Sequence, residues 1–223
     1  MHCKNLSIKK TRPLLPLILD KKMRKLPLFT LLLTLIFSHV FSSSVSAKNL
    51  AIDPDNLFPQ VKLETSMGII IVELDRVRAP ITVDNFLTYV VTGEYNNTIF
   101  HRIVADFIVQ GGGYSKSFAL KKVNGTIINE SGNGLKNEIG TIAMAKENRP
   151  HTANRQFFFN VADNTSLDPG RRWGYAVFGA IVEGQAVVDA MAKAKTAYNE
   201  EMGWENVPME PIMLIKASLL PAN

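Results

Sequence analysis

The chain has 223 residues, of which 25 are basic and 20 acidic, and it contains one cysteine, Cys3. The formal charge of +5 arises in the first 47 residues, which hold eight basic residues and one acidic residue. The other 176 residues have 17 basic and 19 acidic side chains, hence a charge of −2. This balance argues against nucleic-acid binding by that part, and its length suits one domain with a sizeable core.

The first 47 residues have the pattern of a secretory signal peptide. Basic residues precede an apolar run from Leu26 to Phe41, and Val45-Ser46-Ala47 places small residues at a cleavage site. We expect cleavage after Ala47, with Met23 as an alternative start of translation. The apolar run has 16 residues, fewer than the roughly 20 that span a bilayer, so an uncleaved membrane anchor is the less favoured alternative. Cleavage would remove Cys3 and with it all thiol chemistry.

Residues 48–60 form a polar lead-in with several prolines, and a folded domain is predicted over 61–221. Strands are expected at Val61–Thr65 and Ile69–Leu74, joined by a short turn into a hairpin. A helix should begin at Pro80, because Pro suits a first helical turn and apolar residues follow at helical spacing. Gly93 fits the position just past its end.

Two further strands are predicted at Thr98–Val104 and Phe107–Gln110. The three glycines Gly111–Gly113 indicate either a tight turn or a close approach of the backbone to its neighbours. Residues 111–138 contain six glycines, which favours a long ordered loop.

The remaining pattern predicts strands at Gly140–Ala145, Gln156–Val161, Tyr175–Val182 and Pro211–Leu220, and a helix at Gln185–Lys195. Many short strands with two separated helices argue against a doubly wound α/β sheet, which needs a helix after nearly every strand. The pattern favours a mainly β fold, a closed antiparallel barrel whose ends are covered by the two helices.

The sequence beyond the leader lacks the common catalytic motifs. It has no G-x-S-x-G segment, no P-loop and no ligand spacing typical of a metal site, so no metal is expected. Its two histidines are His101 and His151. We interpret His101 as a partly buried histidine with satisfied hydrogen bonds in preference to a catalytic base.

Arg102 and Phe158 are the informative positions. Arg102 is either a functional cation beside an apolar pocket or an edge-strand arginine with its charged end in water. Strand alternation puts Phe158 on one face with Gln156 and Asn160, whereas its two Phe neighbours face the other way. Phe158 therefore either lines an apolar pocket with a polar rim or covers the end of the barrel core.

Four motifs in order resemble the cyclophilin family of peptidyl-prolyl cis-trans isomerases. These are FHRIVADFIVQGGG (100–113), GTIAMA (140–145), QFFFNVADN (156–164) and LDPGRRWGYAVFGAIVEG (167–184). The resemblance implies a closed eight-stranded antiparallel barrel capped by two helices. ESGNGLKNE (130–138) and NVPMEPI (206–212) are similar to the bacterial periplasmic branch, which implies a periplasmic location.

The resemblance also implies the site. Its catalytic group would comprise Arg102, Phe107 and Gln110. Its substrate-binding residues would be Ile108, Met144, Ala145, Lys146, Gln156, Phe158, Leu167 and Tyr175. Two positions differ from eukaryotic members, because Ser166 replaces a tryptophan and Tyr175 a histidine, and the first change implies weak cyclosporin binding.

The implied activity is isomerisation of X–Pro bonds in exported proteins, with no cofactor. Expected partners are proline-containing peptides and unfolded exported proteins, without nucleic acid or stable membrane insertion after cleavage, and the protein should be a monomer. A chaperone or adaptor that binds proline peptides, with incidental catalysis, is the alternative.

Overall fold

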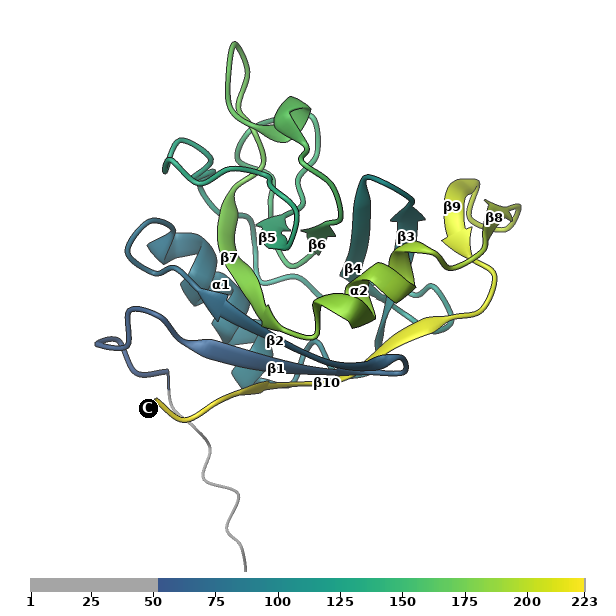
Figure 1. The fold of residues 1–223 in the computed structure, drawn as a ribbon, viewed down its shortest axis with the longest axis horizontal. Coiled ribbons are helices and arrows are strands. Elements are labelled where there is room, and N and C mark those ends of the chain that lie inside the picture. The colour runs from purple at the N-terminus through teal and green to yellow at the C-terminus, as the bar shows by residue number, and fades with distance from the viewer. Residues whose placement is uncertain (1–51, 223) are drawn as a thin grey trace, which may run out of the picture. The chain divides into compact units, whose positions relative to one another are not determined.

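The computed structural model describes residues 52–222, which form a closed barrel of eight antiparallel strands with two helices (Figure 1). The hydrogen-bonded order around the barrel is β1-β10-β3-β4-β6-β5-β7-β2. The predicted architecture is confirmed. The predicted signal peptide, residues 1–47, and its alternative start at Met23 lie outside the described residues. The barrel strands are β1 (Gln60–Thr65), β2 (Gly68–Leu74), β3 (Thr98–Val104), β4 (Ile108–Ser115), β5 (Thr141–Met144), β6 (Phe157–Asn160), β7 (Val177–Glu183) and β10 (Ile212–Leu219).

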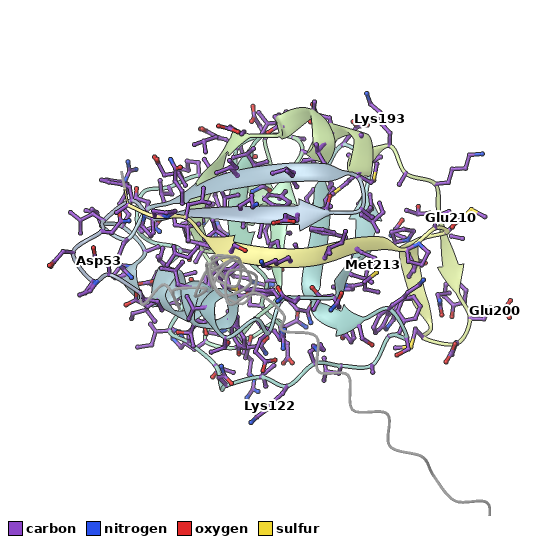
Figure 2. The ribbon with its side chains drawn as sticks, turned by 90° about the horizontal axis from the view of Figure 1, so that it is seen from below. Asp53, Lys122, Lys193, Glu200, Glu210 and Met213 are labelled. Carbon is purple, nitrogen blue, oxygen red and sulfur yellow. The ribbon has the colours of Figure 1, made fainter. Side chains whose placement is uncertain are left out.

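The β1–β2 hairpin begins the barrel and confirms the first predicted turn. Thr65 pairs with Gly68 across that turn. Val61 and Leu63 point into the barrel, whereas Lys62 between them is partly exposed. This alternation buries one face of the strand and exposes the other to solvent. Figure 2 shows the hairpin beside β10, which carries Met213.

Helix α1 (Pro80–Val91) has Pro80 in its first turn and buries its apolar face, as predicted. Gly93 follows it with φ +71, a conformation that glycine adopts without steric cost. Helix α2 (Gln185–Ala192) is three residues shorter than the predicted 185–195, because the chain turns after Lys193 toward another strand. None of the helices within residues 52–222 is long and apolar enough to cross a bilayer.

The glycine run Gly111–Gly113 lies inside β4, so the predicted loop begins only after Ser115. An added Cβ would lie 2.7 Å from Phe100 Cδ1 at Gly111 and 2.6 Å from Gln156 Cγ at Gly113. Of the two predicted explanations, the close approach is therefore correct and the tight turn is wrong. Glycine is needed here because neighbouring side chains occupy the space of its missing side chain.

A second, two-stranded sheet was not predicted. It consists of β8 (Thr196–Asn199) and β9 (Trp204–Pro208). Strand β9 lies against β3, while Glu200 in the connecting turn marks the far end of the hairpin (Figure 2). The segment lacks apolar alternation, since Thr196–Asn199 buries no residue, and periodicity alone could not reveal it.

Aromatic rings fill the barrel interior. Phe157 makes edge-to-face contacts with Phe86, Tyr95, Phe100 and Phe159 at centroid distances of 5.4–6.1 Å. Such pairs contribute about 0.5–1.5 kcal/mol beyond the area they bury. This packing fixes β6, the strand that carries Phe158 on its opposite face.

Candidate active site

A row of polar side chains crosses three adjacent strands. Arg102 on β3 lies opposite Gln110 on β4, which lies opposite Phe158 on β6. Arg102 Nη1 donates to Gln110 Oε1 at 3.3 Å, and Gln110 Nε2 donates to Gln156 Oε1 at 3.0 Å. All three polar residues are half-buried. The register of the barrel thus joins side chains that are up to 54 positions apart in the sequence.

The Arg102 guanidinium keeps most of its donors available. Within the part of the chain that the structure describes, it makes this single hydrogen bond and no ion pair with a carboxylate. A guanidinium has five N–H donors in a fixed plane, so Arg102 can donate to a ligand without losing Gln110.

The predicted apolar pocket corresponds to a cluster of apolar side chains beside the polar row. Its buried members are Ile108, Ala143, Phe158 and Val177, and they form a cluster separate from the barrel core. Phe107, Leu135, Ala145, Leu167 and Tyr175 pack against them. The rings of Phe158 and Tyr175 meet edge to face at 5.6 Å. Because Phe158 belongs to this cluster and not to the main core, it does not cover the end of the barrel core.

The structure separates Met144 from the other predicted substrate-binding residues. Met144 is buried in the main core and pairs with Phe157 across β5 and β6. Its side chain therefore points into the barrel, and the prediction that it contacts substrate is not supported by its position. Ala143 and Val177 line the pocket and were missed. Alternation from Ala145 could have identified Ala143, since residues two apart share a face.

Ala145 and Lys146 form an edge of the site beside the polar row. Here a cavity of about 170 Å³ is lined by Gln110, Ala145, Lys146, Glu147, Thr152, Asn154 and Gln156. The Lys146 ammonium lies 4.6 Å from the ring centroid of Tyr175, and partial burial lowers the pKa of Lys146. The backbone of β5 continues into this edge, because Ala145 N donates to Gln156 O at 2.9 Å.

Backbone hydrogen bonds fix the remaining walls of the pocket. Tyr175 N donates to Leu167 O at 2.9 Å, which closes the loop between these two pocket residues. Asn164 Nδ2 donates to Phe107 O at 2.8 Å and to Asn160 Oδ1 at 2.7 Å. Asn164 is buried and holds Phe107 in place, a supporting role that no sequence pattern indicated.

His101 lies next to Arg102 in sequence but belongs to a different cluster. Its ring stacks edge to face on Tyr114 at 4.8 Å and lies 5.8 Å from Trp204. Burial, with a smaller contribution from the Arg102 charge, lowers its pKa from 6.5 to about 4. The predicted burial is confirmed, but Nδ1 has no hydrogen-bond partner among residues 52–222, so the ring is not fully satisfied.

The described residues contain no group of three His, Cys, Asp or Glu side chains that could hold a metal ion. The site offers the charged donors of Arg102 and Lys146, two amide side chains and an apolar cluster. Such a set can hold a neutral ligand and stabilise a change in its hydrogen bonding.

The family model and the relatives that match this chain are all of the peptidyl-prolyl cis-trans isomerase type. A family model described as cyclophilin type peptidyl-prolyl cis-trans isomerase/CLD matches residues 60–218. The chain is 46% identical over 164 residues to peptidyl-prolyl cis-trans isomerase cyp18 of Streptomyces antibioticus, covering 72% of this chain and 98% of the relative. It is 46% identical over 162 residues to peptidyl-prolyl cis-trans isomerase A of Dickeya dadantii, covering 72% and 84%.

Solved structures agree in fold. A Cryptosporidium parvum cyclophilin type peptidyl-prolyl cis-trans isomerase, crystallised in the presence of the dipeptide Ala-Pro, matches with a TM-score of 0.60. Its sequence identity is 24%, and the match covers 73% of this chain and 99% of that one.

Proposed function

Since this chain belongs to the cyclophilin family and is a peptidyl-prolyl cis-trans isomerase, we propose that Arg102 is its catalytic donor and that its substrates are exported proteins. The observation that carries the first part is the position of Arg102, whose guanidinium is joined to Gln110 at the edge of the apolar pocket. The half-buried setting makes its charge effective, because a donor aimed into an apolar site is screened less than one in water.

The apolar pocket receives the proline ring. Phe107, Ile108, Phe158, Leu167 and Tyr175 belong to one apolar cluster, which offers apolar contact to a saturated five-membered ring. A ring held in this way lets the peptide on the other side of the prolyl bond rotate. The Ala-Pro dipeptide used with the Cryptosporidium relative is in keeping with a proline-containing ligand.

Rotation about an X–Pro bond breaks amide resonance and returns a lone pair to the prolyl nitrogen. We assign Arg102 to donate a hydrogen bond to that nitrogen in the twisted state. The acceptor is absent from the planar ground state, where the nitrogen lone pair is delocalised, so the interaction favours the transition state selectively. Neither a nucleophile nor a proton transfer is needed.

The rate acceleration can be divided among these contacts. Uncatalysed isomerisation takes about tens to hundreds of seconds, so turnover in milliseconds needs roughly a 10⁵-fold acceleration, or about 7 kcal/mol. One charged hydrogen bond contributes about 1.5–3 kcal/mol. The remainder must come from exclusion of water and from better fit of the pocket to the twisted amide.

Gln110 and the edge at Ala145 and Lys146 hold the peptide on either side of the proline. Gln110 is itself fixed by Arg102 and Gln156, so its amide is oriented before substrate arrives. Pre-oriented groups lower the entropic cost of binding.

The proposed substrates are exported proteins, and the proposed location is the periplasm. The support is the signal-peptide pattern of residues 1–47 and the similarity of 130–138 and 206–212 to the periplasmic branch. Unfolded exported chains would present X–Pro bonds in both isomers. We further propose a monomer that binds cyclosporin weakly, since exposed Ser166 offers little apolar contact.

Arg102→Ala tests the assignment. We expect kcat/KM for a proline tetrapeptide to fall by roughly 10–100-fold, the loss of one charged hydrogen bond, while the thermal midpoint changes little because Arg102 is half-buried. The measurement is cis–trans exchange of the peptide by NMR, with and without enzyme.

Arg78→Ala, which removes an exposed arginine paired with Asp75 away from the pocket, is the matched control and should keep wild-type turnover. Unchanged turnover in Arg102→Ala would contradict the mechanism. If Arg102→Ala instead lost turnover but kept the protein's full ability to suppress aggregation of an unfolded client, the effect on clients would be one of binding alone.

A further inference from the structure

A second cavity adjoins the polar row. It has a volume of about 270 Å³, and Arg102, Gln110 and Gln156 form one of its walls. Its other walls come from His101 and Tyr114 and from Trp204 and Glu205 of β9. None of these four residues belongs to the apolar pocket. The roles assigned above therefore leave this cavity unused.

Three aromatic rings shape this cavity. Tyr114 and Trp204 meet edge to face with centroids 4.8 Å apart, and His101 contacts both. Burial holds the His101 ring neutral at neutral pH by lowering its pKa to about 4. The ring thus presents an aromatic surface and not a positive charge.

The charges at the cavity have opposite signs. Arg102 contributes the cation and exposed Glu205 the carboxylate, and Glu205 forms no ion pair within the described range of the chain. Neither sign dominates, so the cavity has no electrostatic preference for a charged side chain. Rings at these distances favour another ring, which can also stack on the guanidinium plane of Arg102.

We propose that this cavity is a specificity subsite that takes an aromatic side chain of the substrate, one or two residues from the isomerising proline. The short spacing follows from Arg102, which lines the cavity and also reaches the prolyl nitrogen, since each extended residue advances only about 3.3–3.6 Å. Trp204 is its specificity-determining residue, delivered by the β8–β9 hairpin. The inference rests on the proposed function of the neighbouring proline pocket.

Five peptides test the subsite. One is Ala-Ala-Ala-Pro-Ala-Ala, and each of the others carries one Phe, one or two residues before or after the proline. NMR titration gives Kd, and exchange between cis and trans signals gives the turnover. We expect at least one Phe peptide to bind roughly five- to tenfold more tightly than the all-Ala peptide, the scale of an aromatic pair. Trp204→Leu should bring this ratio close to one.

Tyr198→Ala is the matched control, because Tyr198 is an exposed aromatic residue of the same hairpin that does not line the cavity. It should keep the wild-type ratio. Tyr114→Leu changes the same aromatic wall from β4. It therefore tests the subsite even if Trp204→Leu fails to fold.

Equal binding of all five peptides by the wild-type protein would overturn the subsite. Tighter binding of a matched peptide with Lys in place of Phe would also overturn it if Glu205→Gln removed that preference, since the cavity would then select a cation. Turnover of the all-Ala peptide distinguishes a failure of the subsite proposal from a failure of the proposed function. If the all-Ala peptide exchanges faster with enzyme while Phe gives no advantage, only the subsite is wrong.

Discussion

Two arginines illustrate how burial decides what a guanidinium does. Arg155 is fully buried, and it donates to the backbone carbonyls of Gly112, Lys122 and Glu94 at 2.5–2.8 Å. Its donors are used within the fold, so its role is to join β4, the long loop and the end of α1. Arg102 is half-buried and keeps donors free. A buried cation needs hydrogen-bond acceptors. A substrate can supply acceptors for the Arg102 donors that remain free.

His101 should make stability depend on pH. Its folded pKa is about 4 and its ordinary value 6.5, so between these values the unfolded chain binds more protons than the folded one. The free energy of unfolding should therefore be highest above pH 6.5 and decline as the pH falls toward 4, by up to about 3 kcal/mol. Urea unfolding at several pH values measures the decline.

His101→Phe keeps a ring against Tyr114 and Trp204 but cannot take up a proton. This variant should lose most of the decline between pH 6.5 and 4. His151→Gln is the control, because His151 is exposed and lies outside this cluster, and it should behave as wild type. A decline in His101→Phe as steep as that of the wild type would show that another group is responsible.

At the scale of elements, β4 connects the core to the site. Its glycines let the neighbouring side chains approach, and its Gln110 joins Arg102 to Gln156. The strand pairs with β3 on one side and β6 on the other. Gln110 and the glycines Gly111–Gly113 lie on the same strand. The backbone position of β4 therefore sets the geometry of the polar row.

Gly113→Ala tests this dependence. The new Cβ would lie 2.6 Å from Gln156 Cγ, so the Gln156 side chain must move and its hydrogen bond to Gln110 should break. We expect kcat/KM to fall by roughly three- to tenfold, the loss of one neutral hydrogen bond. The measurement is peptide exchange by NMR.

Gly132→Ala is the matched control for that change. An added Cβ at Gly132 has no atom within 4 Å, so this variant should retain wild-type kcat/KM. Undiminished turnover in Gly113→Ala would mean that Gln156 is not needed to orient Gln110.

For the whole molecule, the proposed export of the protein makes a specific prediction. Expression of all 223 residues in a Gram-negative host should yield a periplasmic protein that begins at Lys48, because the leader's apolar run is too short to remain as an anchor. Intact mass and N-terminal sequencing of the periplasmic fraction measure this. Recovery of a longer chain in the membrane fraction would instead support the retained anchor.

Elements with a local signal could be predicted from the residues alone. Strand alternation revealed the β1–β2 hairpin, helical spacing and Pro80 identified α1, and alternation in β6 placed Phe158 apart from its neighbours. The order of strands and helices was enough to predict a barrel, and the cyclophilin motifs were enough to predict the family.

Features that depend on register and packing required the folded structure. Whether Gly111–Gly113 turn or approach a neighbour is set by side chains from β3 and β6. Met144 faces the core because β5 pairs with β6 in one register and not the next, and a shift of one residue would reverse that face. The β8–β9 hairpin brings Trp204 beside Arg102 through contacts between residues about 100 positions apart, which no local pattern records.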